Sequence, residues 1–453
     1  MATIATAISG RATKPAIPSV PGVPVFGNLL QFRRDRMALN DLAARTGPIA
    51  RLQLAHIPIY LTTDADLAHD VLVTNAEYYT KSAGLNFLEP LLGNGLLLAE
   101  GSPHKRHRKL LAPAFAPKRM AAYGDKMVAE TIAQIARWRP GQPIDLATEM
   151  MELTLAIAGQ TMFSAHVRDD AKTIAEGLEL AMRSQSASMT SFFRLGYEWP
   201  LPRHRQMRRA VALLDSVVYR LIAEGRARGT DVGDVLSILL LARDEDGSGL
   251  TDRQVRDEAM TLLLAGHETT ANALTWTWYE LGRNPAVLER LRAEVDSVLG
   301  DRTVTADDLP SLPYNAAVID EAMRLHPPAY MIGRESVVPI ELGGHSLPRG
   351  TIIAINTFGI HRREDYYPTP LALKPERMLP DAKKARPRHH YLPFGAGPRI
   401  CIGAHFALLE AQLSLATLVQ RADIHSIATS VDHEPMVTLR AAGGVPAIVS
   451  PRC

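Results

Sequence analysis

The sequence predicts a mainly α-helical protein with small β-sheets (an α+β chain), folded as one large domain. Helical periodicity dominates from about residue 120 to residue 324, whereas strand-like patterns are confined to short zones near residues 49–62, 340–357 and 437–449. No internal repeat and no domain-splitting linker interrupts the 453 residues. Hydrophobic residues make up 46% of the chain and charged residues 22%, which is typical of a globular protein with a sizeable core.

The first expected element is a stiff, extended segment in which prolines recur at every third residue from Pro15 to Pro24. We place it in an N-terminal arm, residues 1–28, and assign residues 29–453 to the single domain. The arm is either a plain linker or a docked segment that orients the first helix, and the sequence leaves both open. After the arm we expect a helix over residues 29–46, a hairpin of strands 49–54 and 57–62, and helical structure over residues 64–78.

Residues 84–98 form an unusual loop, because they are apolar and are broken by Pro90, Gly93 and Gly95. Loops are usually polar, so this one predicts either buried packing or the wall of an apolar pocket. The remaining expected elements are helices over 120–138, 148–162, 171–183 and 207–228, a hairpin over 340–357 across Gly343-Gly344 with a strand over 351–355, a helix over 403–419, and strand and turn over 437–449.

The charge and cysteine counts exclude several classes of protein. Lysine and arginine number 50 against 48 acidic residues, so the net charge gives no argument for nucleic-acid binding. The two cysteines, Cys401 and Cys453, are too few for a disulfide scaffold, a four-cysteine zinc site or a four-cysteine iron–sulfur cluster. The first ten residues do not resemble a secretory signal, and no apolar run reaches the about 18 residues of a membrane span. We therefore expect a cytoplasmic protein with no membrane anchor.

The longest expected helix has an unusual centre. Thr251 and Gln254 form a capping-box signature, and helical patterning continues to Arg283, where Asn284-Pro285 stops it. At about 1.5 Å per residue this helix is roughly 48 Å long and crosses the domain. Its centre, residues 265–270, places a glycine, a carboxylate and two threonines among apolar neighbours, which indicates a site or, alternatively, a packing notch. A helix-borne zinc site is excluded, because the second histidine that it needs is replaced by alanine at position 271.

The segment from Phe394 to Gly403 is the most specific feature of the chain. Its glycines allow the backbone to fold tightly, and Cys401 lies just before a helix, where amide N–H groups and the helix dipole favour a thiolate. From the residues alone, Cys401 is a nucleophile, a metal ligand or an inert core residue. The loop is not a phosphate cradle, because the Gly-Lys-Ser/Thr end of that motif is missing.

Three motifs, in order, resemble those of the cytochrome P-450 heme-thiolate monooxygenases, soluble bacterial type. Residues 394–403 match the family signature Phe-x-x-Gly-x-Arg-x-Cys-x-Gly, Ala265 to Thr269 match Ala-Gly-x-Glu-Thr, and Glu321 to Arg324 match Glu-x-x-Arg. The resemblance covers essentially the whole chain after the proline arm. It implies the single large cytochrome P-450 fold, in which the long central helix crosses over the heme.

The resemblance also implies a role for each matching residue. Cys401 would be the axial thiolate ligand of the heme iron, with Phe394 beside the sulfur. Glu321, Arg324 and Arg377 would form a structural triad on the proximal side of the heme, where Met378 replaces the more usual phenylalanine. Residues 104–108 look like the His-x-Arg-x-Arg variant that contacts the heme propionates. The implied cofactor-binding set is His104, Arg108, Ala265, Arg334, Phe394, Arg399, Cys401 and Gly403.

The implied reaction is the insertion of one oxygen atom from O2 into a lipophilic small molecule, by hydroxylation or epoxidation of a fatty acid, terpenoid, steroid or macrolide. The implied cofactor is heme b (iron protoporphyrin IX). Thr269 would supply a hydroxyl near the iron, Glu268 would feed protons through water, and Gly266 would make room for dioxygen. The implied substrate pocket is lined by Phe87, Leu88, Leu91, Leu264, Ala265, Ala329, Ile332 and Leu439.

The resemblance implies an enzyme of secondary metabolism that is a monomer. It implies that this enzyme receives electrons from a separate ferredoxin or flavodoxin with its NAD(P)H reductase. No flavin or iron–sulfur site is recognisable in this chain, so we expect no fused reductase. The expected docking residues are the basic side chains of Lys105, Arg106, Lys109, Lys383 and Lys384.

Three other functions remain open at this stage. A heme sensor or carrier would keep Cys401 but would not need Glu268 and Thr269. A peroxide-driven enzyme of the same fold would normally replace that acid–threonine pair. A thiol hydrolase without heme would use Cys401 as its nucleophile.

Overall fold

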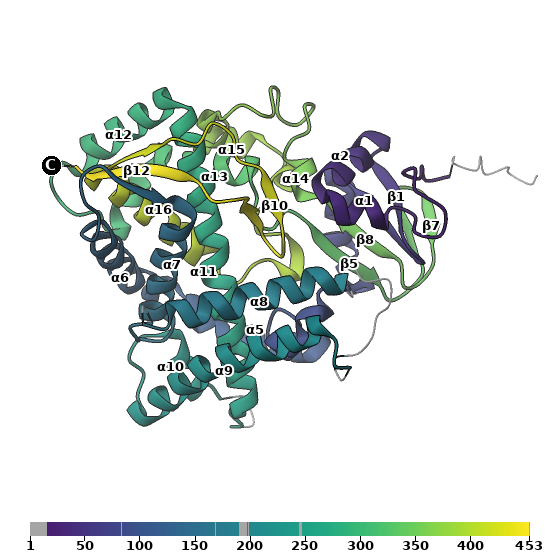
Figure 1. Cartoon of the computed structure of the whole chain (residues 1–453), viewed down its shortest axis with the longest axis horizontal. Coiled ribbons are helices and arrows are strands. Elements are labelled where there is room, and N and C mark those ends of the chain that lie inside the picture. Colours follow the sequence, from purple (N-terminus) through teal and green to yellow (C-terminus); the bar gives the residue numbers. More distant parts are fainter. Residues whose placement is uncertain are drawn as a thin grey trace, which may run out of the picture.

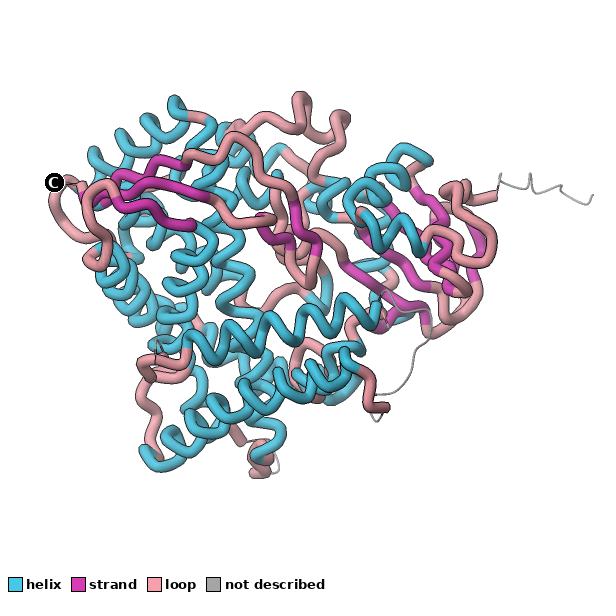
Figure 2. Tube along the Cα trace, in the orientation of Figure 1, coloured by secondary structure: helices cyan, strands magenta, loops and turns pink. Residues whose placement is uncertain are grey.

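The computed structural model describes residues 16–82, 84–167, 169–189, 197, 199–243 and 247–452. Most helices lie at one end of the molecule and the largest sheet lies at the other (Figure 1, Figure 2), which confirms the predicted fold class. Among the described residues, none of the helices combines the length and the apolar character that crossing a bilayer requires.

The described elements have the following bounds. The α-helices are α1 (Leu29–Arg34), α2 (Arg36–Thr46), α3 (Ala65–His69), α4 (Glu89–Leu92), α5 (Gly101–Leu111), α6 (Pro117–Ile135), α7 (Leu146–Met162), α8 (Ala171–Met189), α9 (Pro202–Arg228), α10 (Val235–Leu241), α11 (Asp252–Arg283), α12 (Pro285–Leu299), α13 (Pro313–Leu325), α14 (Thr357–Ile360), α15 (Pro380–Ala385) and α16 (Ala404–Arg421). The short 3₁₀ and π turns are η1 (Asp70–Thr74), η2 (Ala76–Tyr78), η3 (Asn86–Leu88), η4 (Ala112–Phe115), η5 (Ala306–Ser311), η6 (Pro375–Met378), η7 (Arg388–His390) and η8 (Gly397–Arg399). The strands are β1 (Ile49–Leu54), β2 (Ile57–Thr62), β3 (Tyr79–Lys81), β4 (Gln142–Asp145), β5 (Ile332–Ser336), β6 (Ile340–Leu342), β7 (His345–Leu347), β8 (Ile352–Ile355), β9 (Ala422–Ser426), β10 (His433–Pro435), β11 (Leu439–Ala441) and β12 (Pro446–Pro451).

The helix α11 is the axis of the helical part, and its ends lie where the sequence predicts them. The Thr251 hydroxyl accepts from the Gln254 N–H, and the Gln254 side chain accepts from the Thr251 N–H at 2.9 Å, so the capping box is closed. Asn284 ends the helix and Pro285 begins α12. The helices α7, α9 and α13 pack against α11, and Trp276 and Trp278 on its C-terminal half are buried in the main core.

Two predicted elements are wrong in their extent. The helix expected over residues 29–46 is split at Asp35, whose extended backbone (φ −155°) ends α1 and whose carboxylate caps α2 by accepting from the Ala38 N–H at 2.9 Å. The hairpin expected over residues 340–357 contains only β6 and β7, joined by Gly343 and Gly344 at positive φ. The following strand, β8, instead joins the five-stranded sheet β1-β2-β8-β5-β3, where it pairs with β2 and β5 and places Ile353 and Ile355 in a buried core cluster.

The described part of the proline segment is docked on the sheet. The Val20 N–H donates to the Arg51 carbonyl at 2.9 Å, and the Arg51 N–H donates to the Pro18 carbonyl at 2.8 Å. Asn28 is fully buried and its amide oxygen accepts from the Gln53 N–H at 2.9 Å, which fixes the start of α1 against β1. Residues 1–15 and Cys453 lie outside the described residues.

The apolar loop of residues 84–98 is packed against α11. It contains η3 and α4, and Leu88, Leu91 and Leu96 are buried in the main core. Gly93 has φ +55° and lies so close to α11 that a Cβ atom there would overlap the Asp257 carboxylate. Of the two interpretations of this loop, buried packing therefore accounts for much of its apolar character.

Candidate active site

The cysteine loop, residues 394–403, is a tight turn that leads into α16. The Cys401 N–H donates to the Phe394 carbonyl oxygen at 3.0 Å, which closes the loop on itself. Gly397 has φ +70° and lies against η1, where a Cβ atom would overlap the Leu72 carbonyl oxygen, so only glycine fits. The loop therefore holds Cys401 at a defined place just before the first turn of α16.

The Cys401 thiol is accessible although protein surrounds it on most sides. Its residue is exposed to solvent, and yet burial raises the pKa of the thiol, an effect that the Gly403 N–H and the charge of Arg108 oppose. Cys401 is therefore reachable from solvent while protein atoms lie around its sulfur. Burial favours the neutral thiol there, so a stable thiolate would need a cation bound to the sulfur.

The middle of α11 is accessible, whereas most of the helix on either side is buried. Ala265 is exposed, and Leu264, Gly266 and Thr269 are half-buried. The Thr269 hydroxyl donates to the Ala265 carbonyl oxygen at 2.7 Å within the helix. At Gly266 a Cβ atom would lie 2.6 Å from Met162 Cε, so this glycine accommodates α7, as the packing-notch alternative predicts.

The helix α16 connects the cysteine loop with this part of α11. It packs along α11, and its Glu410 carboxyl is buried with neither oxygen hydrogen-bonded among the described residues. Burial raises the pKa of Glu410 well above its ordinary value. Cys401 lies just before α16, and Thr269 lies on α11. Two residues that are 132 positions apart in the sequence therefore belong to parts of the chain that are packed against each other.

A cluster of cationic side chains lies beside the cysteine loop. Arg108 on α5 donates to the Ile400 carbonyl at 2.8 Å, and Arg399 donates to the Ala99 carbonyl at 2.6 Å and pairs with Glu100. Arg334 on β5 is buried and bonds only its neighbour's carbonyl oxygen among the contacts recorded for the described residues. These arginines, with His104, Glu100 and Lys81, form what we call the cationic cluster.

The charges of the cationic cluster repel one another. Burial and then the charges of Arg399 and Arg334 lower the pKa of Lys81 to about 7, while Glu100 opposes them. Burial and then Arg399 lower the pKa of Arg334 to about 10, and burial with several cations, Arg399 first, lowers the pKa of His104 to about 4. Glu100 alone among these residues carries negative charge, so the cationic cluster has room for an anionic group.

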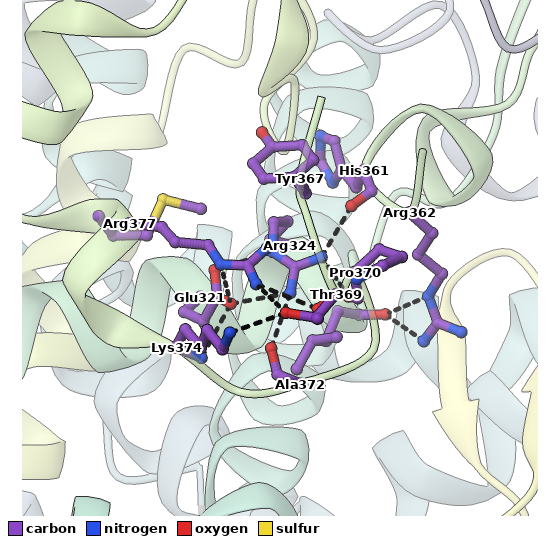
Figure 3. Close-up of polar contacts among 12 residues, drawn as sticks. Glu321, Arg324, His361, Arg362, Tyr367, Thr369, Pro370, Ala372, Lys374 and Arg377 are labelled. Atoms are coloured by element: carbon purple, nitrogen blue, oxygen red, sulfur yellow. Dashed lines mark hydrogen bonds and ion pairs between the residues drawn. The ribbon is translucent and has the colours of Figure 1, made fainter. Parts of the chain in front are cut away.

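The residues Glu321, Arg324 and Arg377 meet in a closed network (Figure 3). Arg324 and Glu321 are fully buried and form a bidentate pair, with both N···O distances 2.8 Å. The remaining donors of Arg324 reach the carbonyls of His361, Pro370 and Ala372. Arg377 Nε lies 3.8 Å from Glu321 Oε1, and the neighbouring Met378 is buried beside Tyr367. The charge and the donor groups of Arg324 are thus compensated entirely within the protein.

Glu268 turns away from the accessible face toward the strand β11. Its Oε1 atom accepts from the Thr438 hydroxyl at 2.6 Å and from Arg440 Nε at 2.9 Å, and the residue is only 3% exposed. The predicted proton donor is therefore held by partners that sequence patterns did not indicate.

The residues predicted to line the substrate pocket fall into two groups. Leu88, Leu91 and Leu439 are buried in core clusters and present almost no accessible surface, because α4 and β11 pack tightly on their neighbours. Phe87 and Ile332 are half-buried, and Ala329 is exposed between buried Pro328 and Tyr330. Gly395 of the cysteine loop lies beside Ile332, since a Cβ atom there would be 3.7 Å from Ile332 Cδ1. The accessible candidates are Phe87, Leu264, Ala265, Ala329 and Ile332.

Lys81 and Arg440 are the most informative residues that sequence reasoning missed. Lys81 ends a three-residue strand, β3, and lies opposite Arg334 in the β3–β5 register. No local motif marks either position, and only the pairing of distant strands brings them to the site.

Of the predicted docking lysines, Lys383 forms an ion pair with the buried Asp320, whereas Lys105 and Lys384 are exposed.

These residues fit a heme. The cysteine sulfur is a suitable axial ligand, the cationic cluster suits two carboxylates, and the accessible turn of α11 offers small side chains where a flat group needs space. The fold and the donor set together therefore fit the class of heme proteins with a cysteine ligand.

Comparisons with known proteins agree with this class. The chain matches the family Cytochrome P450 over residues 17–441 and belongs to it. It is 37% identical to the cyclooctatin synthase of Streptomyces melanosporofaciens over 95% of both chains, and 36% identical to the cyclooctat-9-en-7-ol 5-monooxygenase of the same species over 96% of this chain and 95% of that relative. It is 31% identical to the pentalenene oxygenase of Streptomyces avermitilis over 92% of this chain and 95% of that relative. The protein is therefore an oxidoreductase, a monooxygenase of this family with a heme-iron cofactor.

Proposed function

We propose that this enzyme inserts an oxygen atom from O2 into a terpenoid, with heme b as its cofactor. The observation that carries the proposal is the exposed Cys401 in the loop that leads into α16, together with the exposed turn of α11, the helix against which α16 packs. Cys401 would bind the iron, and Arg108, Arg334, Arg399 and Lys81 would hold the propionates. When bound, the heme supplies the activation of dioxygen.

Thr269 and Glu268 would manage protons at this site. The Thr269 hydroxyl now donates to the Ala265 carbonyl, so it must turn its hydrogen away from that carbonyl before it can pass a proton to another group. Glu268 would then return a proton from solvent to Thr269 through water. The acid–threonine pair favours an oxygen-dependent reaction over the peroxide-driven alternative.

A terpenoid substrate is supported by two independent observations. The accessible lining candidates are apolar and carry no charge. The names of three relatives refer to cyclooctatin, cyclooctat-9-en-7-ol and pentalenene, which are lipophilic molecules. Fatty acids, steroids and macrolides fit the apolar lining but have no such support among these relatives.

Electrons would come from a separate ferredoxin or flavodoxin that docks near α5. Lys105 is exposed on α5, the helix that also supplies Arg108 to the cationic cluster, and Lys384 is exposed on α15. Replacing Lys105 by Glu should slow reduction by an acidic ferredoxin and weaken its salt dependence, while substrate binding is retained. A reduction rate that does not respond to this change or to ionic strength would place docking elsewhere.

The ligand assignment is tested by the carbon monoxide spectrum of the reduced holoprotein. Cys401→Ala should lose the long-wavelength Soret band of a thiolate-bound heme. Cys453→Ala removes the other cysteine and should keep the band, so it is the matched control. If Cys401→Ala keeps the band, the ligand is another residue.

The substrate class is tested by titrating the ferric holoprotein with cyclooctat-9-en-7-ol, pentalenene and lauric acid. A spectral shift that reports loss of iron-bound water is expected with one of the terpenoids at a lower concentration than with the fatty acid. A shift with lauric acid alone would overturn the terpenoid proposal.

The role of Thr269 is tested by counting product and peroxide per electron consumed. Thr269→Ala should still consume reductant but divert it to peroxide, because the hydroxyl that relays the proton is gone. The loss of coupled product is expected to be about 10²-fold or more, as for other positioned acid–base groups. Unchanged coupling would remove Thr269 from the reaction.

A further inference from the structure

The last part of the proline segment forms a turn that the proposed oxidation does not use. The backbones of Val23 and Gly27 exchange two hydrogen bonds, which are 2.9 Å and 2.8 Å long. Inside this bridge the Phe26 N–H donates to the Pro24 carbonyl at 2.8 Å and closes a three-residue γ-turn. We call residues 23–27 the apolar turn.

The apolar turn is fixed to the domain. Asn28, which is fully buried, donates from its side chain to the Pro21 carbonyl at 2.9 Å. Gly27 has φ +56° and lies so close to β1 that a Cβ atom there would overlap the Gln53 carbonyl oxygen. The apolar turn is therefore a built part of the surface of the protein.

Val25 occupies the centre of the apolar turn at φ +68°. This region of backbone conformation suits glycine, and a β-branched residue is seldom found there. The valine side chain is 76% exposed, so it makes few contacts that could offset the strain. An apolar residue that is both strained and exposed is not explained by the fold, which indicates a function for its side chain.

Three further apolar side chains are exposed close to Val25 in the chain. Val23, Phe26 and Leu30 are exposed by 47%, 41% and 49%. They lie at the end of the molecule that holds the largest sheet, where α1 is next to β1 (Figure 1). Single exposed apolar residues are common, but four of them within eight residues, on a turn that is held in place, indicate an interaction surface.

The charge around the apolar turn has one sign. The first 34 residues of the sequence contain the basic residues Arg11, Lys14, Arg33 and Arg34 and no acidic residue. Arg33 and Arg34 are exposed at the end of α1, and in the described part of the chain neither forms an ion pair. The first acidic residue, Asp35, is engaged as the cap of α2. A bilayer with anionic headgroups matches both features, because its acyl layer takes up apolar side chains and its headgroups attract cations.

We propose that the apolar turn, Leu30 and the two arginines Arg33 and Arg34 dock reversibly on the surface of an anionic lipid bilayer. The apolar side chains enter the boundary between headgroups and acyl chains, and the arginines stay among the phosphates. Contact of this kind needs no spanning helix. Its use rests on the proposed function, because a terpenoid substrate collects in bilayers and a docked enzyme can take it up from there.

The charge contribution is tested by sedimentation of the holoprotein with vesicles of phosphatidylglycerol and phosphatidylethanolamine, and with vesicles of phosphatidylcholine alone. The wild type should bind the anionic vesicles more tightly, and high salt should weaken this binding. Arg33→Gln/Arg34→Gln should lower the partition coefficient by about twentyfold at low salt, since each cation near such a surface contributes about fivefold. The control Arg205→Gln/Arg253→Gln removes two exposed arginines from α9 and α11 and should bind like the wild type.

The apolar contribution is tested by Val25→Gly. Glycine suits the backbone at this position, so the free energy of unfolding should not fall. Binding to the anionic vesicles should weaken by about three- to tenfold, because the apolar side chain is gone. The control Leu371→Ser changes a residue that is 69% exposed in another loop and should leave vesicle binding unchanged. A Val25→Gly variant that binds like the wild type, or that is less stable, would assign Val25 to the fold and overturn the proposal.

Other occupants of this surface give different results. Dimerisation of the wild type at rising concentration, lost in Val25→Gly, would make the apolar turn an interface between two copies of the chain. Slower reduction by a plant-type ferredoxin in Arg33→Gln/Arg34→Gln, without vesicle binding by the wild type, would make it a protein-docking surface. Absence of vesicle binding, or equal binding to neutral and anionic vesicles, would by itself overturn the proposal. If the wild type binds anionic vesicles but oxidises no terpenoid, the substrate proposal fails while docking is confirmed.

Discussion

Two arginine-rich regions of this protein differ in how their charge is compensated. Around Arg324 every donor group finds a protein acceptor, namely the Glu321 carboxylate and three backbone carbonyls, and the pair has no exposed surface. In the cationic cluster Arg334, Arg399 and Lys81 share a single carboxylate, Glu100, and the pKa of each is lowered first by burial and then by the charges of neighbouring arginines. A buried charge that protein groups compensate fully stabilises the fold. A buried positive charge without enough carboxylates around it indicates a binding site for an anionic ligand.

The largest effect is expected from a substitution that removes the carboxylate partner of Arg324. Glu321→Ala leaves Arg324 buried without its carboxylate, so the free energy of unfolding should fall by about 3–5 kcal/mol in the apoprotein as well as in the holoprotein. Urea unfolding of both forms measures this. A normal unfolding free energy would show that the backbone carbonyls alone sustain Arg324, and the contrast between the regions would fail.

The next largest effect is expected from a substitution in the cationic cluster. Arg334→Met removes one cation but keeps the volume of the side chain, so heme retention should fall by roughly tenfold or more, as expected for a charge-assisted hydrogen bond. The unfolding free energy of the apoprotein should stay the same or rise, because repulsion is relieved. Heme transfer to apomyoglobin and urea unfolding measure the two quantities. A destabilised apoprotein with unchanged heme retention would make Arg334 a structural residue like Arg324.

A smaller effect appears in the pH dependence of stability. The pKa of Lys81 is lowered to about 7 in the folded protein, below its ordinary value of 10.5, so the unfolded chain binds more protons between these values. The stability of the apoprotein should therefore rise with pH from about 7 upward, and Lys81→Met should reduce this slope. Bound heme propionates would raise the pKa of Lys81 and flatten the slope in the holoprotein. An identical slope in Lys81→Met and the wild type would contradict the assignment.

The smallest effect serves as the reference for both regions. Arg290 and Glu376 form an ion pair in which both side chains are 53% exposed. Arg290→Ala should change the unfolding free energy by less than about 1 kcal/mol and should leave heme retention unchanged. A larger loss of stability would mean that the exposed fraction of an ion pair does not predict its contribution to the free energy of unfolding in this protein.

Local chemistry explains which parts were predicted from the sequence. The capping residues Thr251 and Gln254 and the stop at Asn284-Pro285 act within one or two turns, so the ends of α11 could be predicted. The pairing of β8 with β2 and β5 could not, because it depends on strands elsewhere in the fold, whereas the split at Asp35 rests on a local cap at Ala38 that the helical periodicity did not indicate. Leu439 shows the same limit at the site, where packing against Tyr330 and Phe358 places it in the core.

By itself the sequence determined the helical class, the central helix and the cysteine loop, because these depend on periodicity, caps and glycines that act between near neighbours. Only the tertiary structure decided which charges lie together. Lys81 and Arg334 meet across β3 and β5, and Glu268 meets Arg440 across 172 residues. Strand pairing and helix packing bring such residues together, and no local pattern encodes the pairing. The physical reason is that charge interactions depend on distance in space and on burial, and both are set only when the chain has folded.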